Sequence, residues 1–175
     1  MPRLRKMLND FNAPYIKPLM RQIETQSKIT LVNWAVDYSE RVILPLWLKY
    51  CPDDLRPKFA LDSARQWLNG KIKLQQAKKK ILRCHEAARE AEGNHVAHIA
   101  ARAIAQSVST IHAARHCIGL ALYGALAIAY DELGTEAPWE RLELRASEEC
   151  ERMLAALWEI SIVDESNPAN IDWYY

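Results

Sequence analysis

The stretch from His95 to Tyr130 constrains the fold more than any other part of this chain. It contains no proline, its only glycines are Gly119 and Gly124, and alanine, leucine and isoleucine dominate it. Because alanine is the best helix former, the stretch predicts one long helix, or two helices with a bend near Gly119. Small apolar residues occur all round this segment, which indicates that other helices enclose it. The rest of the chain is therefore expected to pack around a long central alanine-rich helix.

Polar side chains within this stretch gather on one side. At about 100° per residue, the following polar residues fall within an arc of about 80°: His98, Arg102, Ser109, His112, His116 and Tyr123. A helix that only packs in the hydrophobic core does not need polar side chains aligned along one side. We therefore predict that the imidazoles of this polar stripe face neighbouring helices rather than solvent.

Length and pattern indicate one helical domain. A chain of 175 residues can bury roughly 70% of the surface that it exposes when unfolded. No segment alternates between apolar and polar residues over a useful length, so we expect almost no strand. The prediction is an all-α, single-domain bundle of about five to seven helices. Residues 1–14 would form an N-terminal basic arm, residues 15–160 the bundle, and residues 161–175 a C-terminal aromatic tail.

Capping and breaking residues place the individual helices. Besides the central segment, helices are predicted over residues 15–26, 31–50, 57–68, 74–91 and from Pro138 to about residue 160. Thr30 and Thr135 are the expected N-caps of two of them. Pro45 lies inside a helical pattern and removes an amide donor, so a kink is expected there.

Charge and hydropathy argue against nucleic acid and membranes as partners. The formal net charge is only +1, from 23 basic and 22 acidic side chains, so the whole protein has no electrostatic bias toward a polyanion. The basic arm could support a nucleic-acid-associated regulator, but it lacks the interleaved aromatic residues that stack on bases. No apolar run approaches ~20 residues, so no membrane span is expected.

The four cysteines give no disulfide pattern. Cys51, Cys84, Cys117 and Cys150 are evenly spaced, but the residues around them share no pattern, so we interpret the spacing as coincidence. There is no CxxC pair and no apolar signal segment at the N-terminus. Reduced thiols and a cytoplasmic location are therefore expected.

Two histidines have the spacing of metal ligands on a helix. His112 and His116 are four residues apart, and His98, His85, Asp37 or Asp62 could supply a third ligand. No HExxH motif accompanies them, and histidines in an alanine-rich helix are more often hydrogen-bonded to nearby polar groups. We therefore predict no metal and no cofactor. The alternative hypothesis is a metal- or ligand-binding helical enzyme that uses His98, His112 and His116.

No catalytic motif is present. The chain lacks GxSxG, the P-loop and GxGxxG, so no catalytic residue is predicted. An acidic group on the last helix would form a solvated face that could attract a basic partner: Glu143, Glu148, Glu149 and Glu151. Most of the six tryptophans should be core anchors, and any exposed one near that face would be a candidate contact hot spot. The terminal aromatics Trp173, Tyr174 and Tyr175 are expected to dock on the bundle or on a partner.

Polar residues at inward-facing positions of four helices indicate a binding cleft. The candidate rim residues are Trp34, Asp37, Arg41, Asp62, Arg65, His85, Arg89, His112 and His116. Asp37 and Arg41 are spaced as a helical ion pair, and so are Asp62 and Arg65. If these residues instead form a saturated interior network, the interface must lie elsewhere.

Several segments, in order, resemble a bacterial family of candidate immunity proteins of polymorphic toxin systems. They are LVNWAVDYSERVILPLW, RPKFALDSARQWLNGKI, CHEAAREA and ARAIAQSVSTIHAARHCIGLALYGALA. The shared motifs are W-A-x-x-x-x-E-R from Trp34 to Arg41, A-R-x-W-L-x-G from Ala64 to Gly70, and the T-x-H of Thr110 and His112 with His116 beyond it. The resemblance covers roughly residues 30–130.

The resemblance implies a small cytoplasmic all-α protein that binds and neutralises a toxin domain, with no established catalytic residue. The leading hypothesis is therefore a non-enzymatic binding protein that acts by occluding a protein partner. The sequence identifies neither the partner nor the oligomeric state, and a homo-oligomer stays open.

Overall fold

The computed structural model describes residues 3–173, and these residues form helices without a single strand. The α-helices are α1 (Lys17–Ile23), α2 (Lys28–Tyr38), α3 (Leu44–Tyr50), α4 (Arg56–Leu68), α5 (Leu74–Glu90), α6 (His95–Ser109), α7 (Leu126–Leu133) and α8 (Trp139–Ile160). The π-helical segment η1 (Ser39–Ile43) joins α2 to α3, the 3-10 turn η2 (Ala114–Cys117) follows α6, and the π-helical segment η3 (Leu120–Ala125) leads into α7. Within the described part of the chain this makes seven continuous helical rods, which confirms the all-α bundle.

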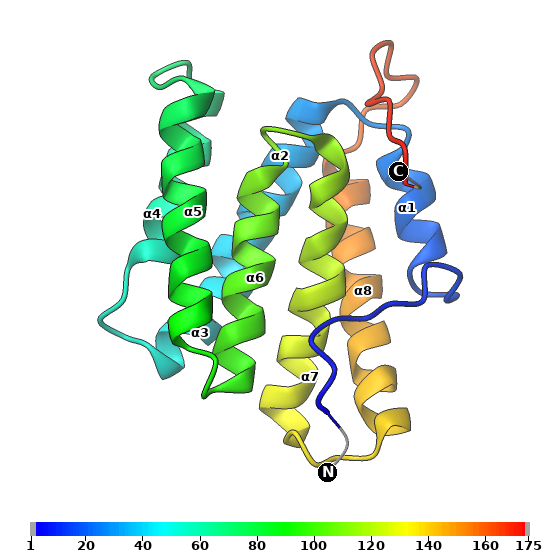
Figure 1. The fold of residues 1–175 in the computed structure, drawn as a ribbon. Helices are drawn as coiled ribbons and strands as arrows, with labels where there is room; N and C mark the ends of the chain where they lie inside the picture. Colours follow the sequence, from blue (N-terminus) through cyan, green and yellow to red (C-terminus); the bar gives the residue numbers. More distant parts are fainter. Residues whose placement is uncertain (1–2, 174–175) are drawn as a thin grey trace.

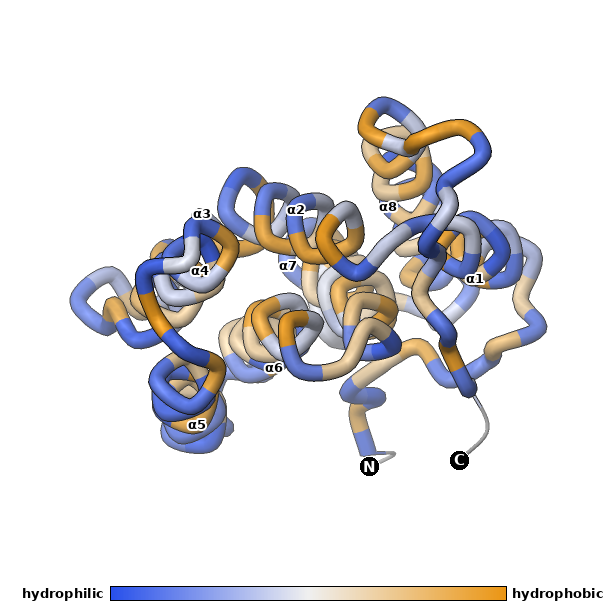
Figure 2. The backbone as a smooth tube through the Cα atoms, turned by 90° about the horizontal axis from the view of Figure 1, so that it is seen from above, coloured by the Kyte–Doolittle hydropathy of each residue, from blue (hydrophilic) through white to orange (hydrophobic). Residues whose placement is uncertain are grey.

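Helix α6 is the centre of the bundle. It packs against α2, α3, α4, α5 and α7, with α4 and α5 on one side and α7, α8 and α1 on the other (Figure 1). Twelve of its fifteen residues are buried. Its alanines have small side chains, which let neighbouring helices approach closely from every direction. The expected central alanine-rich helix is therefore present, and Figure 2 shows the same arrangement from above.

The central helix is shorter than predicted, because the chain reverses direction at residues 110–113. Helix α6 ends at Ser109, and the chain returns through η2 and η3 so that α7 runs antiparallel beside it (Figure 1). The predicted single helix, and the predicted bend near Gly119, are both wrong. A straight helix of this length would span roughly 50 Å. Folding it back buries both apolar halves inside one bundle.

Several helix ends differ from the predicted caps by a few residues. Ser27, not Thr30, caps α2, because its hydroxyl oxygen accepts the Thr30 N–H at 3.3 Å. Asn94 caps α6 by accepting the Ala97 N–H at 3.0 Å. Helix α8 starts after Pro138 rather than with Thr135 as its cap. Ser27 and Asn94 are thus side-chain caps, whereas Pro138 stands before the first turn of α8 without a side-chain cap bond.

Pro45 is accommodated by a widened turn. The π-helical segment η1 immediately precedes it, and the Leu44 N–H bonds to the Ser39 carbonyl five residues back. Because proline has no N–H and crowds the preceding turn, a π-helical turn lets the rod continue from α2 into α3. The expected disturbance at Pro45 thus takes the form of this turn.

Phe59, Leu82 and Trp158 are large and apolar but lie on the surface. The exposed fractions are 47% for Phe59, 63% for Leu82 and 60% for Trp158. Helices α4 and α5 pack mainly against each other and α6, so each is covered on only part of its circumference. Helical periodicity predicts where an apolar face is centred, but not where its covering neighbours end.

Both ends of the described chain lie against the bundle. Residues 3–16 form no helix. The Leu8 N–H donates to the Leu122 carbonyl at 2.8 Å, and the Arg5 guanidinium lies 3.8 Å from the centre of the Trp139 ring. At the other end, Trp173 Nε1 donates to Glu24 Oε1 at 2.6 Å, so this aromatic residue docks on the bundle. Tyr174 and Tyr175 lie outside the described residues.

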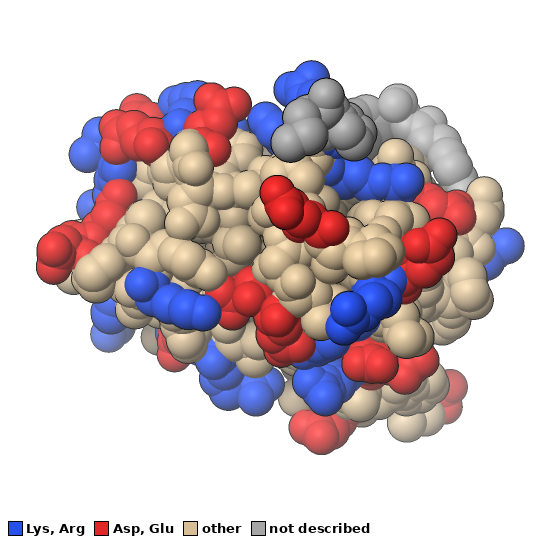
Figure 3. All heavy atoms as spheres, turned by 90° about the horizontal axis from the view of Figure 1, so that it is seen from below, with Lys and Arg blue, Asp and Glu red and all other residues tan. Residues whose placement is uncertain are grey.

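Charged side chains of both signs are mixed on the surface. Seen from below, Lys and Arg alternate with Asp and Glu, and no large area carries one sign (Figure 3). This face therefore lacks the basic patch that a nucleic-acid partner would need. No helix in residues 3–173 has the length and apolar character to cross a membrane.

Candidate functional site

A groove between α2, α4 and α8 brings together four of the predicted rim residues. Trp34, Asp37, Arg41 and Arg65 line a cavity of about 370 Å³, together with Thr30, Asn33, Ala156, Glu159 and Ile160. Trp34 forms the floor: it is 2% exposed, and its Nε1 donates to the Met153 carbonyl at 2.9 Å. This bond ties α2 to α8, and it satisfies the only polar atom of a buried indole ring.

Ion pairs form the rim of this groove. Arg41 Nε donates to Asp37 Oδ2 at 3.0 Å, as the sequence spacing predicts. Arg65 Nε donates to Glu40 Oε2 at 3.0 Å, and the Arg65 guanidinium lies 3.8 Å from Asp37 Oδ1. Each partner is about half exposed, so each pair contributes at most about 1 kcal/mol to stability. These charges are consequently free to re-pair with a bound partner at low cost.

The other predicted rim residues do not reach the groove. Asp62 pairs with Lys58 at 2.9 Å rather than with Arg65. Arg89 is exposed on α5. His85 points toward α6, where the Arg102 guanidinium donates to His85 Nδ1 at 2.5 Å. The helical spacing of Asp62 and Arg65 therefore did not identify the true partner of Arg65, which comes from η1.

His85 is a neutral imidazole held between helices. Because an arginine has only donors, His85 Nδ1 must be the acceptor of the Arg102 bond. Burial, and then the positive charge of Arg102, lower the pKa of His85 to about 4. The bond links α5 to α6, so His85 belongs to a polar network between these two helices.

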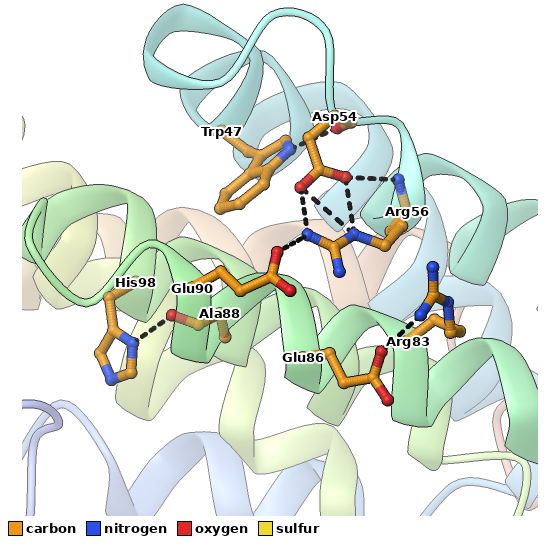
Figure 4. Close-up of polar contacts among 8 residues, drawn as sticks. All are labelled: Trp47, Asp54, Arg56, Arg83, Glu86, Ala88, Glu90 and His98. Carbon is orange, nitrogen blue, oxygen red and sulfur yellow. Dashed lines mark hydrogen bonds and ion pairs between the residues drawn. The ribbon is translucent and has the colours of Figure 1, made fainter.

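The predicted polar stripe on one continuous helix is wrong, because the reversal at residues 110–113 divides it. His98 is buried on α6, where its Nδ1 donates to the Ala88 carbonyl at 2.6 Å (Figure 4). His112 is exposed in the turn, and His116 lies in η2 with its Nδ1 donating to Gln106 Oε1 at 3.0 Å. The imidazole rings of His112 and His116 stack with centres 6.5 Å apart.

This geometry removes the basis of the histidine metal site. His112 and His116 are not on one helical face, and the ring nitrogen of His98 closest to α5 is already engaged. Among the residues that the structure describes, no three His, Cys, Asp or Glu side chains are placed to hold one metal ion. Burial lowers the pKa of both His98 and His116, which favours their neutral, hydrogen-bonded forms.

The predicted solvated acidic face on α8 is only partly solvated. Glu149 is 3% exposed, and its carboxylate accepts from Tyr38 at 2.5 Å, Arg145 at 3.1 Å and Arg152 at 3.3 Å. Glu143 accepts from the Tyr15 hydroxyl at 2.9 Å. Only Glu148 and Glu151 are exposed and project into solvent. The buried carboxylate connects α2 to α8, and it contributes to a structural network rather than to a docking face.

A second charged network connects the α3–α4 loop to α5. Asp54 accepts from Arg56 Nη2 at 2.7 Å, Arg56 also pairs with Glu90, and Trp47 Nε1 donates to the Asp54 carbonyl at 2.8 Å (Figure 4). The hydrogen bonds from Arg56 lower the pKa values of Asp54 and Glu90. These contacts fix the start of α4 and so help to position Arg65 at the groove.

The sequence prediction missed the contribution of α8 to the groove. Glu159 and Ile160 were not among the candidate rim residues, and Trp158 is one of the six tryptophans, most of which were expected to be core anchors. All three are exposed at the end of this helix. One signal in the sequence was available: no Lys, Arg or His occurs after Arg152. This indicates that the end of α8 and the segment beyond it differ in character from the rest of the surface.

The fold and the groove define an all-α bundle with a charged surface cleft and no recognisable catalytic constellation among its described residues. The family described as "Imm-5 like putative immunity protein" matches residues 21–156. The chain therefore belongs to this family, in agreement with the resemblance seen in its motifs. Comparison with curated proteins gave no match, and comparison with solved structures gave none either.

Proposed function

We propose that this chain is a cytoplasmic immunity protein that binds a toxin domain and neutralises it by occlusion, without catalysis. Membership of the immunity family, over most of the chain, is the observation that carries this proposal. The bundle supports it in one physical respect. Most helices are held by a common core, so the binding surface is rigid and loses little conformational freedom on association.

The groove between α2, α4 and α8 is the proposed centre of the contact. Its floor is the fixed indole of Trp34, and its rim carries Asp37, Arg41 and Arg65 in half-exposed ion pairs. Charges that are held in place but remain in contact with water can steer a complementary partner and increase the association rate. In this proposal residues 15–160 supply the groove, and the basic arm braces the bundle.

The histidine-based alternative has no observation in its favour. His98 and His85 are engaged between α5 and α6, whereas His112 is exposed in the turn beyond α6. Two measurements test this alternative directly. Purified protein should contain no stoichiometric zinc, iron or nickel, and His112→Ala should bind the toxin as the parent does.

Co-expression with a toxin encoded beside this gene tests the proposal in cells. We expect cells that carry both genes to grow and cells that carry the toxin alone to stop growing. In vitro, toxin activity should fall to zero at one immunity protein per toxin, and mass spectrometry should find the toxin chemically unchanged. Inactivation at far lower ratios, or a covalently altered toxin, would show catalysis and contradict occlusion.

Two aspartates provide a matched pair for the proposed contact. Asp37 and Asp62 each pair with a cation four residues away and are similarly exposed, at 53% and 42% of the side chain, but only Asp37 lines the groove. Asp37→Ala should weaken toxin binding about tenfold or more, and Asp62→Ala less than about threefold. Equal effects in titration calorimetry would show that the groove is not the contact.

A further inference from the structure

Beyond the groove, the chain presents an apolar turn at the end of α8. Trp158 is 60% exposed, Ile162 is 52% exposed, and Val163 is 86% exposed. Single exposed apolar residues are common on protein surfaces. Here four large ones occur within six positions, since Ile160 is also 43% exposed, and Figure 2 shows hydrophobic stretches of the chain at the outer edge of the molecule next to the end of α8.

Trp158 is exceptional among the tryptophans. Trp34 and Trp47 are buried in the core, whereas Trp67, Trp139 and Trp173 are partly buried. All six tryptophans fall within the described residues, and Trp158 is the only one in the exposed class. A largely exposed indole loses the burial that normally stabilises this residue, so its position is better explained by binding than by folding.

The turn that carries these residues is held in place by buried polar side chains. Gln26, which is 2% exposed, pairs with both backbone groups of Ile162: its Oε1 accepts the N–H at 2.8 Å, and its Nε2 donates to the carbonyl at 3.1 Å. The Gln26 carbonyl also accepts the Ala169 N–H at 2.8 Å. Gln22, also buried, donates from Nε2 to the Ser161 hydroxyl at 2.9 Å.

This arrangement fixes the backbone at Ile162, directly before Val163, and again at Ala169, while the Val163 side chain stays in water. At the tip, Asp164 has a φ of 55°, a conformation that aspartate tolerates better than most residues. A segment whose backbone is already ordered loses little entropy when it binds, so its apolar side chains can contribute nearly their full burial energy to a contact.

The negative charge around the turn indicates which kind of partner it could bind. Asp164 and Glu165 line one hollow with Trp158, Ile162 and Val163, and Glu159 follows Trp158 in the chain. No Lys, Arg or His occurs from Met153 to the end of the chain. Within residues 3–173, none of these three carboxylates forms an ion pair, unlike the charges on the groove rim. An unneutralised acidic rim around an apolar centre is complementary to an apolar pocket rimmed by Lys and Arg.

We propose that Trp158, Ile162 and Val163, with Glu159, Asp164 and Glu165, form a docking surface for a basic protein domain. We name this set the α8 turn face. It rests on the proposed function, in which the basic domain is the toxin. Glu159 and the adjacent Ile160 also line the groove, so the groove and the α8 turn face form one continuous contact. The family match ends at residue 156, so the α8 turn face lies outside the part of the chain that matches the family.

The probe for this surface is the toxin domain encoded beside this gene, in an inactivated form, with binding measured by titration calorimetry. Trp158→Ala and Val163→Ser should each raise the dissociation constant about thirtyfold or more if these side chains are hot spots. Leu82→Ala is the matched control, because Leu82 is 63% exposed but lies on α5. It should change the dissociation constant less than about threefold.

The acidic rim has a separate readout. Asp164→Asn combined with Glu165→Gln should slow association at low salt and make the association rate less dependent on salt concentration. Circular dichroism of each variant should match the parent, since Trp158, Val163 and Asp164 are exposed and a glutamine at position 165 can still accept the Asn167 N–H. If Trp158→Ala folds poorly, Val163→Ser and the double variant at Asp164 and Glu165 still test the docking surface.

The outcomes separate the two proposals. If the parent protein binds the toxin and all α8 turn face variants bind with unchanged affinity, the docking surface is refuted while the immunity function stands. If the parent neither binds nor neutralises the toxin, the proposed function fails, and the assignment of a toxin to this surface fails with it. Weakened binding in the α8 turn face variants, with Leu82→Ala unchanged, would support both.

Discussion

At the level of single residues, Glu149 is the one carboxylate of residues 3–173 that is buried, at 3% exposed. Its buried carboxylate accepts from Tyr38, Arg145 and Arg152. Glu149→Gln keeps the shape of the side chain but leaves the partly buried Arg145 with only Glu132 as an acidic partner. Removing one member of a buried charge network is costly, so we expect a loss of about 2–4 kcal/mol in the free energy of unfolding. Urea unfolding followed by circular dichroism measures this difference.

The neighbouring glutamate is the control for that substitution. Glu148 lies on the same helix but is exposed, so Glu148→Gln should change the free energy of unfolding by no more than about 0.5 kcal/mol. Similar stabilities for the two variants would mean that the Glu149 carboxylate contributes little to the contact between α2 and α8.

The lowered pKa of His85 predicts how the free energy of unfolding depends on pH. This pKa is about 4 in the folded protein, against 6.5 as the ordinary value. Between these values the unfolded chain binds a proton that the folded chain does not, so stability is full above pH 6.5 and falls as the pH is lowered toward 4. His85 is partly exposed, so we discount the full shift for solvent screening and expect a loss of about 1–2 kcal/mol.

The measurement compares variants, because carboxylates also titrate in this range. Free energies of unfolding are determined at pH 7 and pH 4.5 for the parent, His85→Gln and His112→Gln. The glutamine at position 85 can still accept from Arg102 but does not titrate, so its loss between the two pH values should be smaller by about 1–2 kcal/mol. His112 is exposed, and its variant should lose as much as the parent. A His85→Gln loss equal to that of the parent would show that His85 titrates normally.

At the level of elements, the close contact between α6 and the returning chain depends on Gly119. A Cβ at this position would lie 2.4 Å from Gln106 Cβ and 2.6 Å from Gln106 Cγ. The backbone of Gly119 is helical, with φ of −60°, so helix propensity alone would favour alanine by about 1 kcal/mol. The clash involves atoms next to the α6 backbone, so it should dominate, and Gly119→Ala should cost about 1–3 kcal/mol.

Gly93→Ala is the control for the substitution at Gly119. A Cβ at Gly93 would meet nothing within 4 Å, so Gly93→Ala should be neutral or slightly stabilising, by up to about 1 kcal/mol. Thermal unfolding of the two variants beside the parent tests the difference. A Gly119→Ala protein as stable as the Gly93→Ala protein would mean that α6 and the returning chain can separate at little cost.

The sequence predicted where helices end better than it predicted which segments pack against each other. Helix α4 ends at Leu68, the last residue of the predicted helix, and Gly70 beyond it takes a positive φ of 71° that glycine adopts without strain. Helix α6 begins at His95, where the predicted central segment begins, with Asn94 as its cap. By contrast, nothing in the run Thr110–Ala113 resembles a usual breaker, so the reversal between α6 and α7 was not predicted. Local signals identify an end only where the local residues cause it.

At the level of the whole molecule, one core connects helices from both halves of the chain. Trp34 and Trp47 are 2% and 0% exposed, and both belong to this core with residues of α6 and α8. Helix formation and tryptophan burial should therefore be lost together. We expect the urea midpoints from far-ultraviolet circular dichroism and from tryptophan fluorescence to coincide, as in two-state unfolding. A fluorescence midpoint at clearly lower urea would reveal a part of the bundle that opens separately.

The sequence by itself determined that this protein is all-α, roughly where most helices begin and end, and which family it belongs to. Those properties depend on helix propensity, capping and motif order, which act over a few neighbouring residues. Only the tertiary structure decided that the alanine-rich stretch folds back on itself, that Arg65 pairs with Glu40, and that Trp158 is left exposed. These outcomes depend on which surfaces meet across long separations in the chain, and no local pattern encodes that choice.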